Sequence, residues 1–277
     1  MACIQCTMKL RHTLAFALLA ALLPILLAQR ASRAAAQETP AVRVPVIVEL
    51  FTSEGCSSCP PADALIARLA KTQPVPGAEI IPLKLHVDYW NRLGWTDPFS
   101  SAAFSERQAH YADSIENSSV YTPQMIVDGQ VEFVGSSEAK ALRAIAAAAH
   151  SPKPALEVRV DTKAGNTVTV QARVPPRSGR TPGAATDIFL AVTEDNLHSD
   201  VKSGENAGRS FDHVAVVRLL IPQVRVRPTQ QDNADVSFTF ALKPAWKREH
   251  LRAVVFVQEE KSRRILAAAS LPLATSH

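Results

Sequence analysis

Cys56 and Cys59, two cysteines separated by two serines, are the residues of this sequence best suited to chemistry. Two thiols at this spacing can form a reversible disulfide or supply two soft ligands to a metal ion. A strand-like run over residues 46–51 ends just before the pair, and a helix-like apolar pattern over residues 62–71 follows it. Both thiols are therefore expected at a helix N-terminus, where unpaired N–H groups and the helix dipole favour thiolate. We expect Cys56 to be the exposed nucleophile and Cys59 to be the deeper, resolving cysteine.

The apolar pattern divides the chain into two parts. Residues 37–150 alternate strand-like and helix-like segments, which is typical of an α/β unit with a mainly parallel sheet. Residues 155–277 carry seven short strand-like runs with Pro- and Gly-rich connections and few helical signals. That pattern favours a β-sandwich. The sequence therefore predicts an α/β domain followed by an all-β, sandwich-like domain.

The N-terminal segment predicts export from the cytoplasm. Lys9 and Arg11 precede an uncharged, Leu- and Ala-rich run over residues 13–28, and an Ala-x-Ala cleavage pattern ends at Ala36. This order is that of a secretory signal peptide, and the run is shorter than the roughly 20 residues of a spanning helix. We expect residues 1–36 to be removed, no membrane span to be left, and the mature protein to be periplasmic or secreted.

Loss of residues 1–36 would change both the charge and the cysteine content. The segment holds four of the 30 basic residues and no acidic one, so 26 bases would face 26 acids in the mature chain. A chain without net charge has no overall attraction for nucleic acid, so no nucleic-acid partner is expected. Cys3 and Cys6 leave with the segment, and the loop between Cys56 and Cys59 is too short to hold a large domain together. A chemical role for the remaining pair is favoured.

Two histidines could take part in a polar or chemical site. His86 and Asp88 alternate along a strand-like run and should share one face of its end. From there His86 could take the proton of Cys59, or complete a metal site with both sulfurs. A buried, hydrogen-bonded histidine is the favoured alternative. His213 and Arg218 lie on another strand-like run, where structural hydrogen bonding is the favoured interpretation.

Several motifs together resemble those of one protein family. They are VELFTSEGCSSCPPAD at residues 48–63, HVDYW at 86–90, LGW at 93–95, RQ at 107–108, YTPQ at 121–124 and GENAGR at 204–209. With these motifs the chain is similar to DUF1223, a bacterial family of exported thioredoxin-like proteins with no assigned activity. The resemblance covers nearly all of the mature chain and implies a thioredoxin-like fold for the first domain, in agreement with a CxxC pair beside a βαβ pattern.

The resemblance also implies a second marker of the site. Thioredoxin-like folds place a cis-proline opposite the cysteine pair, at the junction where Pro123 precedes a strand–turn–strand pattern over residues 124–134. Asp128 and Gly129, which both tolerate positive φ, are expected to form its turn. Thr122 would then offer backbone groups for strand-like pairing with a bound polypeptide. The alternative is an ordinary trans-proline at the start of a strand. Because two serines replace the Gly-Pro of ordinary thioredoxins, their redox potential cannot be carried over to this chain.

Three functions are open at this point. The favoured one is an exported thiol–disulfide oxidoreductase that acts through Cys56 and Cys59 on envelope proteins, with no cofactor and with an external redox partner to reload the pair. The second is a copper-binding metallochaperone that uses both cysteines as ligands, alone or together with His86. The third is a non-enzymatic binding protein in which the cysteines form a structural disulfide.

Overall fold

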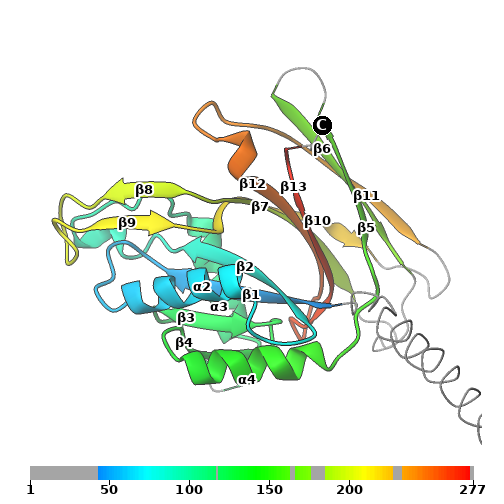
Figure 1. Cartoon of the computed structure of the whole chain (residues 1–277), viewed down its shortest axis with the longest axis horizontal. Coiled ribbons are helices and arrows are strands. Elements are labelled where there is room, and N and C mark those ends of the chain that lie inside the picture. Colours follow the sequence, from blue (N-terminus) through cyan, green and yellow to red (C-terminus); the bar gives the residue numbers. More distant parts are fainter. Residues whose placement is uncertain (1–42, 117, 163–165, 176–184, 227–232, 275–277) are drawn as a thin grey trace, which may run out of the picture. The chain divides into compact units, whose positions relative to one another are not determined.

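The structure, a computed structural model, describes residues 43–116, 118–162, 166–175, 185–226 and 233–274 (Figure 1). The predicted signal peptide lies outside these ranges. Within them, no helix combines the length and the apolar character that crossing a membrane requires.

Eight strands form one mixed sheet through the centre of the described chain (Figure 1). In spatial order they are β13 (Ile265–Pro272), β12 (Leu251–Glu259), β7 (Thr186–Glu194), β10 (Val216–Val226), β2 (Ala78–His86), β1 (Val44–Thr52), β3 (Gln124–Val127) and β4 (Val131–Val134). β1 and β2 run parallel over their whole length. β10 joins β2 in parallel at one register pair, Val216 with Lys84, and the other neighbours are antiparallel.

This sheet shows that the predicted fold class, an α/β thioredoxin-like domain followed by a separate β-sandwich, is wrong. The described chain is mostly β structure, and strands from both halves of the sequence belong to the same sheet. The apolar pattern correctly marked many strands, but it does not specify which strand pairs with which. β10 covers the outer edge of β2, an edge that would otherwise be open for pairing. The predicted domain boundaries stay a prediction.

Helices cover both faces of the N-terminal strands. α2 (Pro60–Thr72) and α4 (Glu138–Ala149) pack in one cluster with Val46, Val48 and Leu50, which alternate along β1. α3 (Ala102–Ala112) packs in a second cluster with Ile47 and Phe51, which point to the opposite face. Complete burial of such a side chain contributes about 1.5–3 kcal/mol, so these two clusters hold β1, and the cysteines that follow it, firmly in place.

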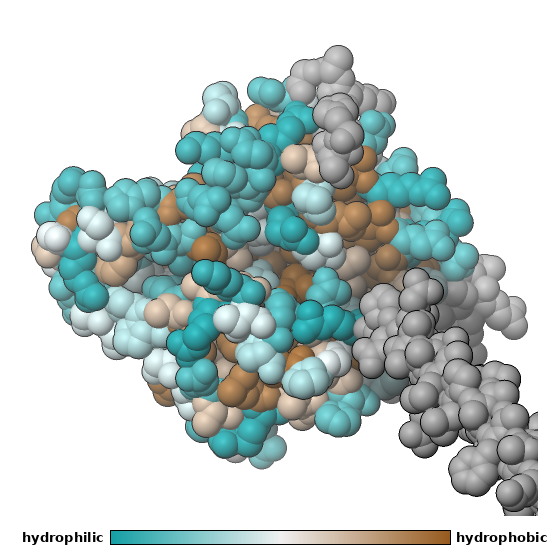
Figure 2. Space-filling model, viewed as in Figure 1, coloured by the Kyte–Doolittle hydropathy of each residue, from teal (hydrophilic) through white to brown (hydrophobic). Residues whose placement is uncertain are grey.

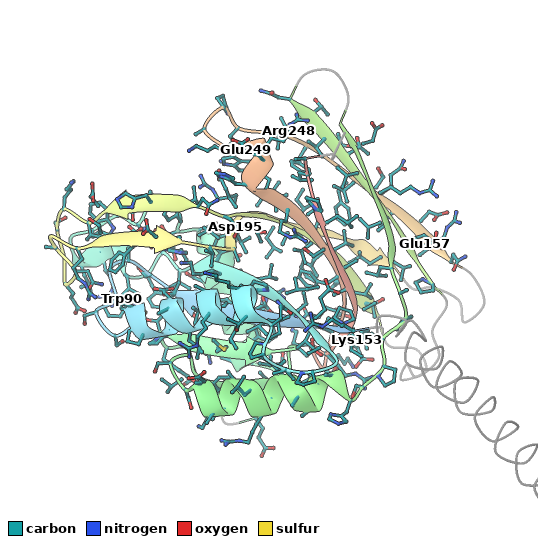
Figure 3. The ribbon with its side chains drawn as sticks, in the orientation of Figure 1. Trp90, Lys153, Glu157, Asp195, Arg248 and Glu249 are labelled. Carbon is teal, nitrogen blue, oxygen red and sulfur yellow. A yellow bond between two sulfur atoms is a disulfide. The ribbon has the colours of Figure 1, made fainter. Side chains whose placement is uncertain are left out.

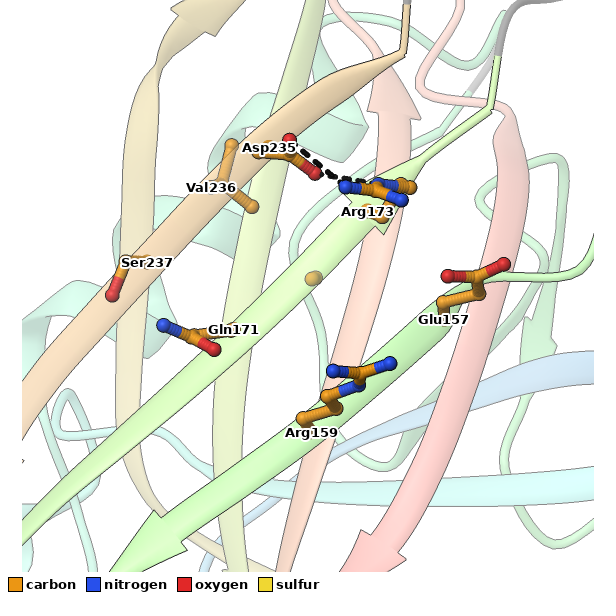
Figure 4. A pocket seen from close by; sticks show the side chains of 8 residues that line it. Glu157, Arg159, Gln171, Arg173, Asp235, Val236 and Ser237 are labelled. Carbon is orange, nitrogen blue, oxygen red and sulfur yellow. Dashed lines mark hydrogen bonds and ion pairs between the residues drawn. The ribbon is translucent and has the colours of Figure 1, made fainter.

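A second layer covers the C-terminal strands. β5 (Glu157–Thr162), β6 (Thr167–Val174) and β11 (Ala234–Ala241) form a three-stranded sheet that shares an apolar cluster with β7 and β12. The outer face of this small sheet is polar and carries a shallow hollow of about 400 Å³ (Figure 4). Arg173 and Asp235 form an exposed ion pair there, with Nε 2.9 Å from Oδ1. This sheet positions no residue of the cysteine site.

The predicted turn at Asp128 and Gly129 is confirmed and brings the two halves of the chain together. It joins β3 to β4, with φ of 50° at Asp128 and 69° at Gly129. The backbone N–H of Ile265 donates to the carbonyl oxygen of Asp128 at 3.1 Å. A Cβ atom on Gly129 would lie 2.0 Å from the carbonyl oxygen of Arg263. Only glycine therefore fits both the positive φ and the close approach of the C-terminal chain.

A two-stranded hairpin, β8 (Leu197–Asp200) and β9 (Ser210–His213), extends from the C-terminal half of the chain to the end of the molecule where β1 connects to α2 (Figure 1). In the view of Figure 2 the surface at this end is largely hydrophilic.

Candidate functional site

Cys56 and Cys59 form a disulfide between β1 and α2, with Cα atoms 5.4 Å apart. The predicted order of strand, cysteine pair and helix is confirmed. Cys59 is the N-cap of α2, and Pro60 and Pro61 occupy the first helical positions, where a missing N–H costs least. The N–H groups of Ala62 and Asp63 both donate to the carbonyl oxygen of Cys59. Few N–H groups are thus free to point at a sulfur atom.

Both cysteines are completely buried, with an exposed fraction of 0%. The prediction that Cys56 is exposed is therefore wrong. Ser57 and Ser58, which lie between the cysteines, are exposed. The chain that covers the turn includes Asn206, 150 residues further along, whose side chain donates to the carbonyl oxygen of Cys56. Local sequence patterns cannot predict burial of the cysteines by residues that are so distant in the sequence.

The peptide bond between Thr122 and Pro123 is cis, as the family resemblance implied. The Thr122 hydroxyl donates to Cys56 Sγ at 3.4 Å and accepts a hydrogen bond from Trp90 Nε1 at 2.8 Å. Trp90 comes from the segment after β2 (Figure 3). Its Cβ would lie 3.3 Å from a Cβ built on Gly55, so this tryptophan packs directly against the cysteine turn. The structure thus brings Thr122 and Pro123 to the disulfide.

A chain of buried polar groups lies next to the cysteine turn. Lys84 Nζ is 2.6 Å from His213 Nδ1, and His213 Nε2 is 2.8 Å from Glu54 Oε1. All three side chains are almost fully buried. Asp63, on α2, lies at 3.7 Å from Lys84 Nζ and also accepts from the hydroxyl of Thr52. The row therefore carries a cation at one end and a carboxylate at the other, with a histidine between them.

Burial and hydrogen bonding set the charges of this row. Burial lowers the pKa of His213 below its usual value, and it also lowers the pKa of Lys84. A neutral His213 fits the geometry, since Nδ1 can accept from Lys84 while Nε2–H donates to Glu54. Burial acts to raise the pKa of Glu54, but hydrogen bonds from His213, Ser199 and Trp95 outweigh it and hold that pKa below its usual value.

His86 lies beside this row, in hydrogen-bonding contact with Asp97. His86 Nδ1 is 2.7 Å from Asp97 Oδ2, which also accepts from the backbone N–H of Glu54 at 2.8 Å. Burial acts to raise the pKa of Asp97, but the interaction with His86 and the backbone N–H groups of Glu54 and Phe99 together outweigh it and lower that pKa. The His86 and His213 rings are 5.2 Å apart. The structure therefore places His86 as a buried, hydrogen-bonded histidine.

In the described part of the chain, no three His, Cys, Asp or Glu side chains are grouped as metal ligands. The copper-binding role stays a prediction.

Several residues of this site do not follow from the sequence patterns. Lys84 could have been noticed as a lone cation in the apolar run of β2, because buried lysines need partners. Asn206 and Glu205 belong to the GENAGR motif, which carries the family resemblance but does not indicate that these residues contact the cysteine turn. The hydrogen bonding expected for His213 is confirmed, and its bond to Glu54 joins it to the turn before Cys56.

We expect His213 to make the protein less stable as the pH falls below the ordinary histidine pKa of about 6.5. The unfolded chain then takes up a proton, while buried His213, with its lowered pKa, does not. The free energy of unfolding should fall by up to about 1.4 kcal/mol per pH unit until the folded pKa is reached. Glu54, whose pKa is lowered from 4.5, loses its contribution only at lower pH.

His213→Gln should remove this slope, because glutamine can accept from Lys84 and donate to Glu54 but does not titrate. Urea unfolding from about pH 7 to about pH 5 measures it. His110→Gln, at an exposed position, is the control and should keep the slope. An equal slope in wild type and His213→Gln would contradict the assignment.

Among the solved structures that match, two cover most of this chain and have a similar fold. A crystal structure of a protein from Agrobacterium tumefaciens gives a TM-score of 0.63 at 24% identity and covers 85% of this chain and 97% of that chain. HBP35 of Porphyromonas gingivalis gives a TM-score of 0.59 at 14% identity and covers 85% of this chain and 79% of that chain. At these identities the likeness shows the fold alone. No functionally curated protein matches the sequence.

A family comparison agrees with the motifs found around the cysteine pair. The family described as "Protein of unknown function (DUF1223)" matches residues 47–258, a range that includes the disulfide, the cis-proline and the β8–β9 hairpin. The match spans most of the chain, and the protein therefore belongs to the DUF1223 family.

Proposed function

We propose that this protein exchanges disulfides with partner proteins through Cys56 and Cys59. The observation that supports the proposal is the row of Lys84, His213 and Glu54, buried next to the cysteine turn. Burying charged groups is unfavourable, and a disulfide that only holds a loop needs none of them. Perturbed ionisable groups gather at chemical sites, which favours a reactive disulfide over an inert one.

The reaction needs only the two cysteines and two partner thiols. In the oxidising direction a partner thiolate attacks Cys56 Sγ, the bond between Cys56 and Cys59 breaks, and Cys59 leaves as a thiolate that takes up a proton. The partner's second thiolate then attacks the partner sulfur of the mixed disulfide, and Cys56 leaves and takes up a proton. Two electrons pass to the cysteine pair and the partner gains a disulfide. Reduction of a partner is the reverse.

Two polar groups near Cys56 have opposite effects on the stability of a Cys56 thiolate. The Thr122 hydroxyl, at 3.4 Å from Cys56 Sγ, would stabilise a thiolate there. Glu54, two residues away, opposes a thiolate by like charge. Among the described residues, no backbone–backbone hydrogen bond involves Thr122, so its N–H and C=O are available to pair with an extended partner segment.

The proposal keeps the expected setting. The protein would act in the cell envelope on protein thiols or disulfides, and an external redox partner would restore the pair, because no other cysteine follows residue 59. Complete burial of both sulfurs means that the covering chain must move before a partner can attack.

The same burial favours a second candidate, a structural disulfide that fixes the start of α2. Equilibration of the purified protein in thiol–disulfide buffers, followed by alkylation and mass measurement, separates the two. A midpoint between about −120 and −270 mV is expected for an exchanging pair. A midpoint below about −300 mV, with no disulfide passed to a test protein, would show that the disulfide is structural.

A further inference from the structure

The connection between β8 and β9 contacts the cysteine turn and is built as a unit of its own. We call residues 201–209 the clasp. Its two ends are joined by backbone hydrogen bonds, from Val201 N–H to Arg209 and from Gly208 N–H to Val201, both at 2.9 Å. Inside it, Arg209 Nη1 donates to Asn206 Oδ1 at 3.0 Å and orients the amide. The clasp can therefore move without losing its internal bonds.

The clasp contacts the cysteine turn through very few groups. Asn206 Nδ2 donates to the carbonyl oxygens of Glu54 at 2.8 Å and Cys56 at 3.0 Å. Glu205 Oε2 accepts from the backbone N–H of Ser57 at 3.1 Å. Outside the turn, the clasp also donates to the segment after β2, from the hydroxyl of Ser203 to the carbonyl oxygen of Gly94.

Burial within the clasp is equally sparse. Only Val201 and Asn206 are buried among its nine residues, and the others are exposed. Segments with few buried apolar contacts open at low free energy, while the base of the hairpin is held by His213 and Ser199 against Glu54. The outer part of the hairpin is thus suited to opening while its base stays in place.

The clasp forms hydrogen bonds with backbone groups of the cysteine turn that a bound partner polypeptide would also need. A polypeptide that pairs with the backbone of the turn as well as with Thr122 would donate to the carbonyl oxygens of Glu54 and Cys56 and accept from the N–H of Ser57. Asn206 and Glu205 already make these bonds. A partner and the clasp therefore cannot occupy the turn together.

We propose that the clasp is an autoinhibitory segment and that Asn206 locks it, so that a partner polypeptide reaches Cys56 only by displacing residues 201–209. This inference rests on the proposed function, of which it is the regulation. Asn206 acts here as a positioning residue, because it contacts the turn and not a sulfur atom.

The test is the rate at which dithiothreitol reduces the disulfide, followed by alkylation and mass measurement. Asn206→Ala removes two hydrogen bonds to the turn, and reduction should become about tenfold faster. Re-oxidation should be faster by a similar factor, and the midpoint potential should stay unchanged. The reason is that the variant changes how easily a reagent reaches the cysteines, but not the relative stability of the oxidised and reduced forms. Lys202→Ala, an exposed clasp residue, is the matched control and should react at the wild-type rate.

Glu205→Ala provides a second variant at an exposed position, where folding is not at risk, and should increase both rates by about two- to fivefold. Wild-type reduction rates in both Asn206→Ala and Glu205→Ala, with unchanged circular dichroism, would overturn the proposal that the clasp restricts access to Cys56. If Asn206→Ala does not fold, a wild-type reduction rate in Glu205→Ala is sufficient by itself to overturn this proposal. If both variants are reduced faster but no disulfide is transferred to a test protein, the proposed exchange function is refuted. The conclusion that the clasp restricts access to the disulfide then still holds.

Discussion

Cys56→Ser is expected to lower disulfide exchange to the uncatalysed rate, a loss of at least about a thousandfold, which is the scale on which removing a nucleophile acts in enzymes. Cys56 Sγ accepts the hydrogen bond from the Thr122 hydroxyl, and Cys56 directly precedes the exposed serines of the turn. Serine keeps the shape of the side chain, but its hydroxyl cannot form a mixed disulfide. Transfer of a disulfide to a reduced test protein, followed by mass measurement, gives the rate.

Cys59→Ser should behave differently and accumulate a covalent complex with a disulfide-bearing test protein. Cys56 can still attack the partner, but no neighbouring thiol is left to resolve the mixed disulfide. The double replacement of Cys56 and Cys59 by serine is the control and should form no complex. Non-reducing gels measure the yield. Equal amounts of complex from Cys56→Ser and Cys59→Ser would show that the assignment of attacking and resolving cysteines is wrong.

Arg107→Ala is expected to lower the free energy of unfolding by about 3–5 kcal/mol, because it leaves the buried carboxylate of Glu49 without its cationic partner. Arg107 Nε and Nη2 bind both oxygens of Glu49, at 2.6 Å and 3.1 Å, and Glu49 is fully buried. Burial acts to lower the pKa of Arg107, but Glu49 and Tyr111 more than compensate and raise it, so the guanidinium stays charged. Its Cζ lies 4.9 Å from the ring centroid of Phe189.

Urea unfolding at neutral pH measures this loss. Arg173→Ala is the matched control, since Arg173 pairs with Asp235 on the exposed face of the small sheet and its loss should change stability little. Replacing Arg107 and Glu49 together, by methionine and leucine, should recover much of the loss, because no unpaired charge is then buried. A loss in Arg107→Ala no larger than in Arg173→Ala would contradict the importance of this pair.

The Arg107 cluster also joins residues from both halves of the chain. Glu49 and Arg107 come from the N-terminal half, whereas Gln258, which accepts from Arg107 Nη1 at 3.2 Å, and the ring of Phe189 come from the C-terminal half. The buried ion pair is thus completed by residues far away in the sequence. A separate N-terminal domain would leave part of the Arg107 guanidinium uncovered.

Local structure around the cysteines could be predicted from the sequence alone, because it depends on neighbouring residues. The strand before Cys56, the helix after Cys59 and the Asp128–Gly129 turn follow from apolar periodicity and from residues that tolerate positive φ. The cis bond before Pro123 and membership of DUF1223 followed from motif resemblance rather than from periodicity.

Only the tertiary structure decided strand pairing, burial and charge at the site. A strand pattern specifies which side chains share a face, but not that β10 pairs with β2, because pairing depends on edges that form only after collapse. The same holds for Asn206, which reaches Cys56 across 150 residues, and for His213, which joins Lys84 to Glu54. Burial depends on which distant segment packs on a turn, so the sequence identified the sulfur atoms but not that they are enclosed.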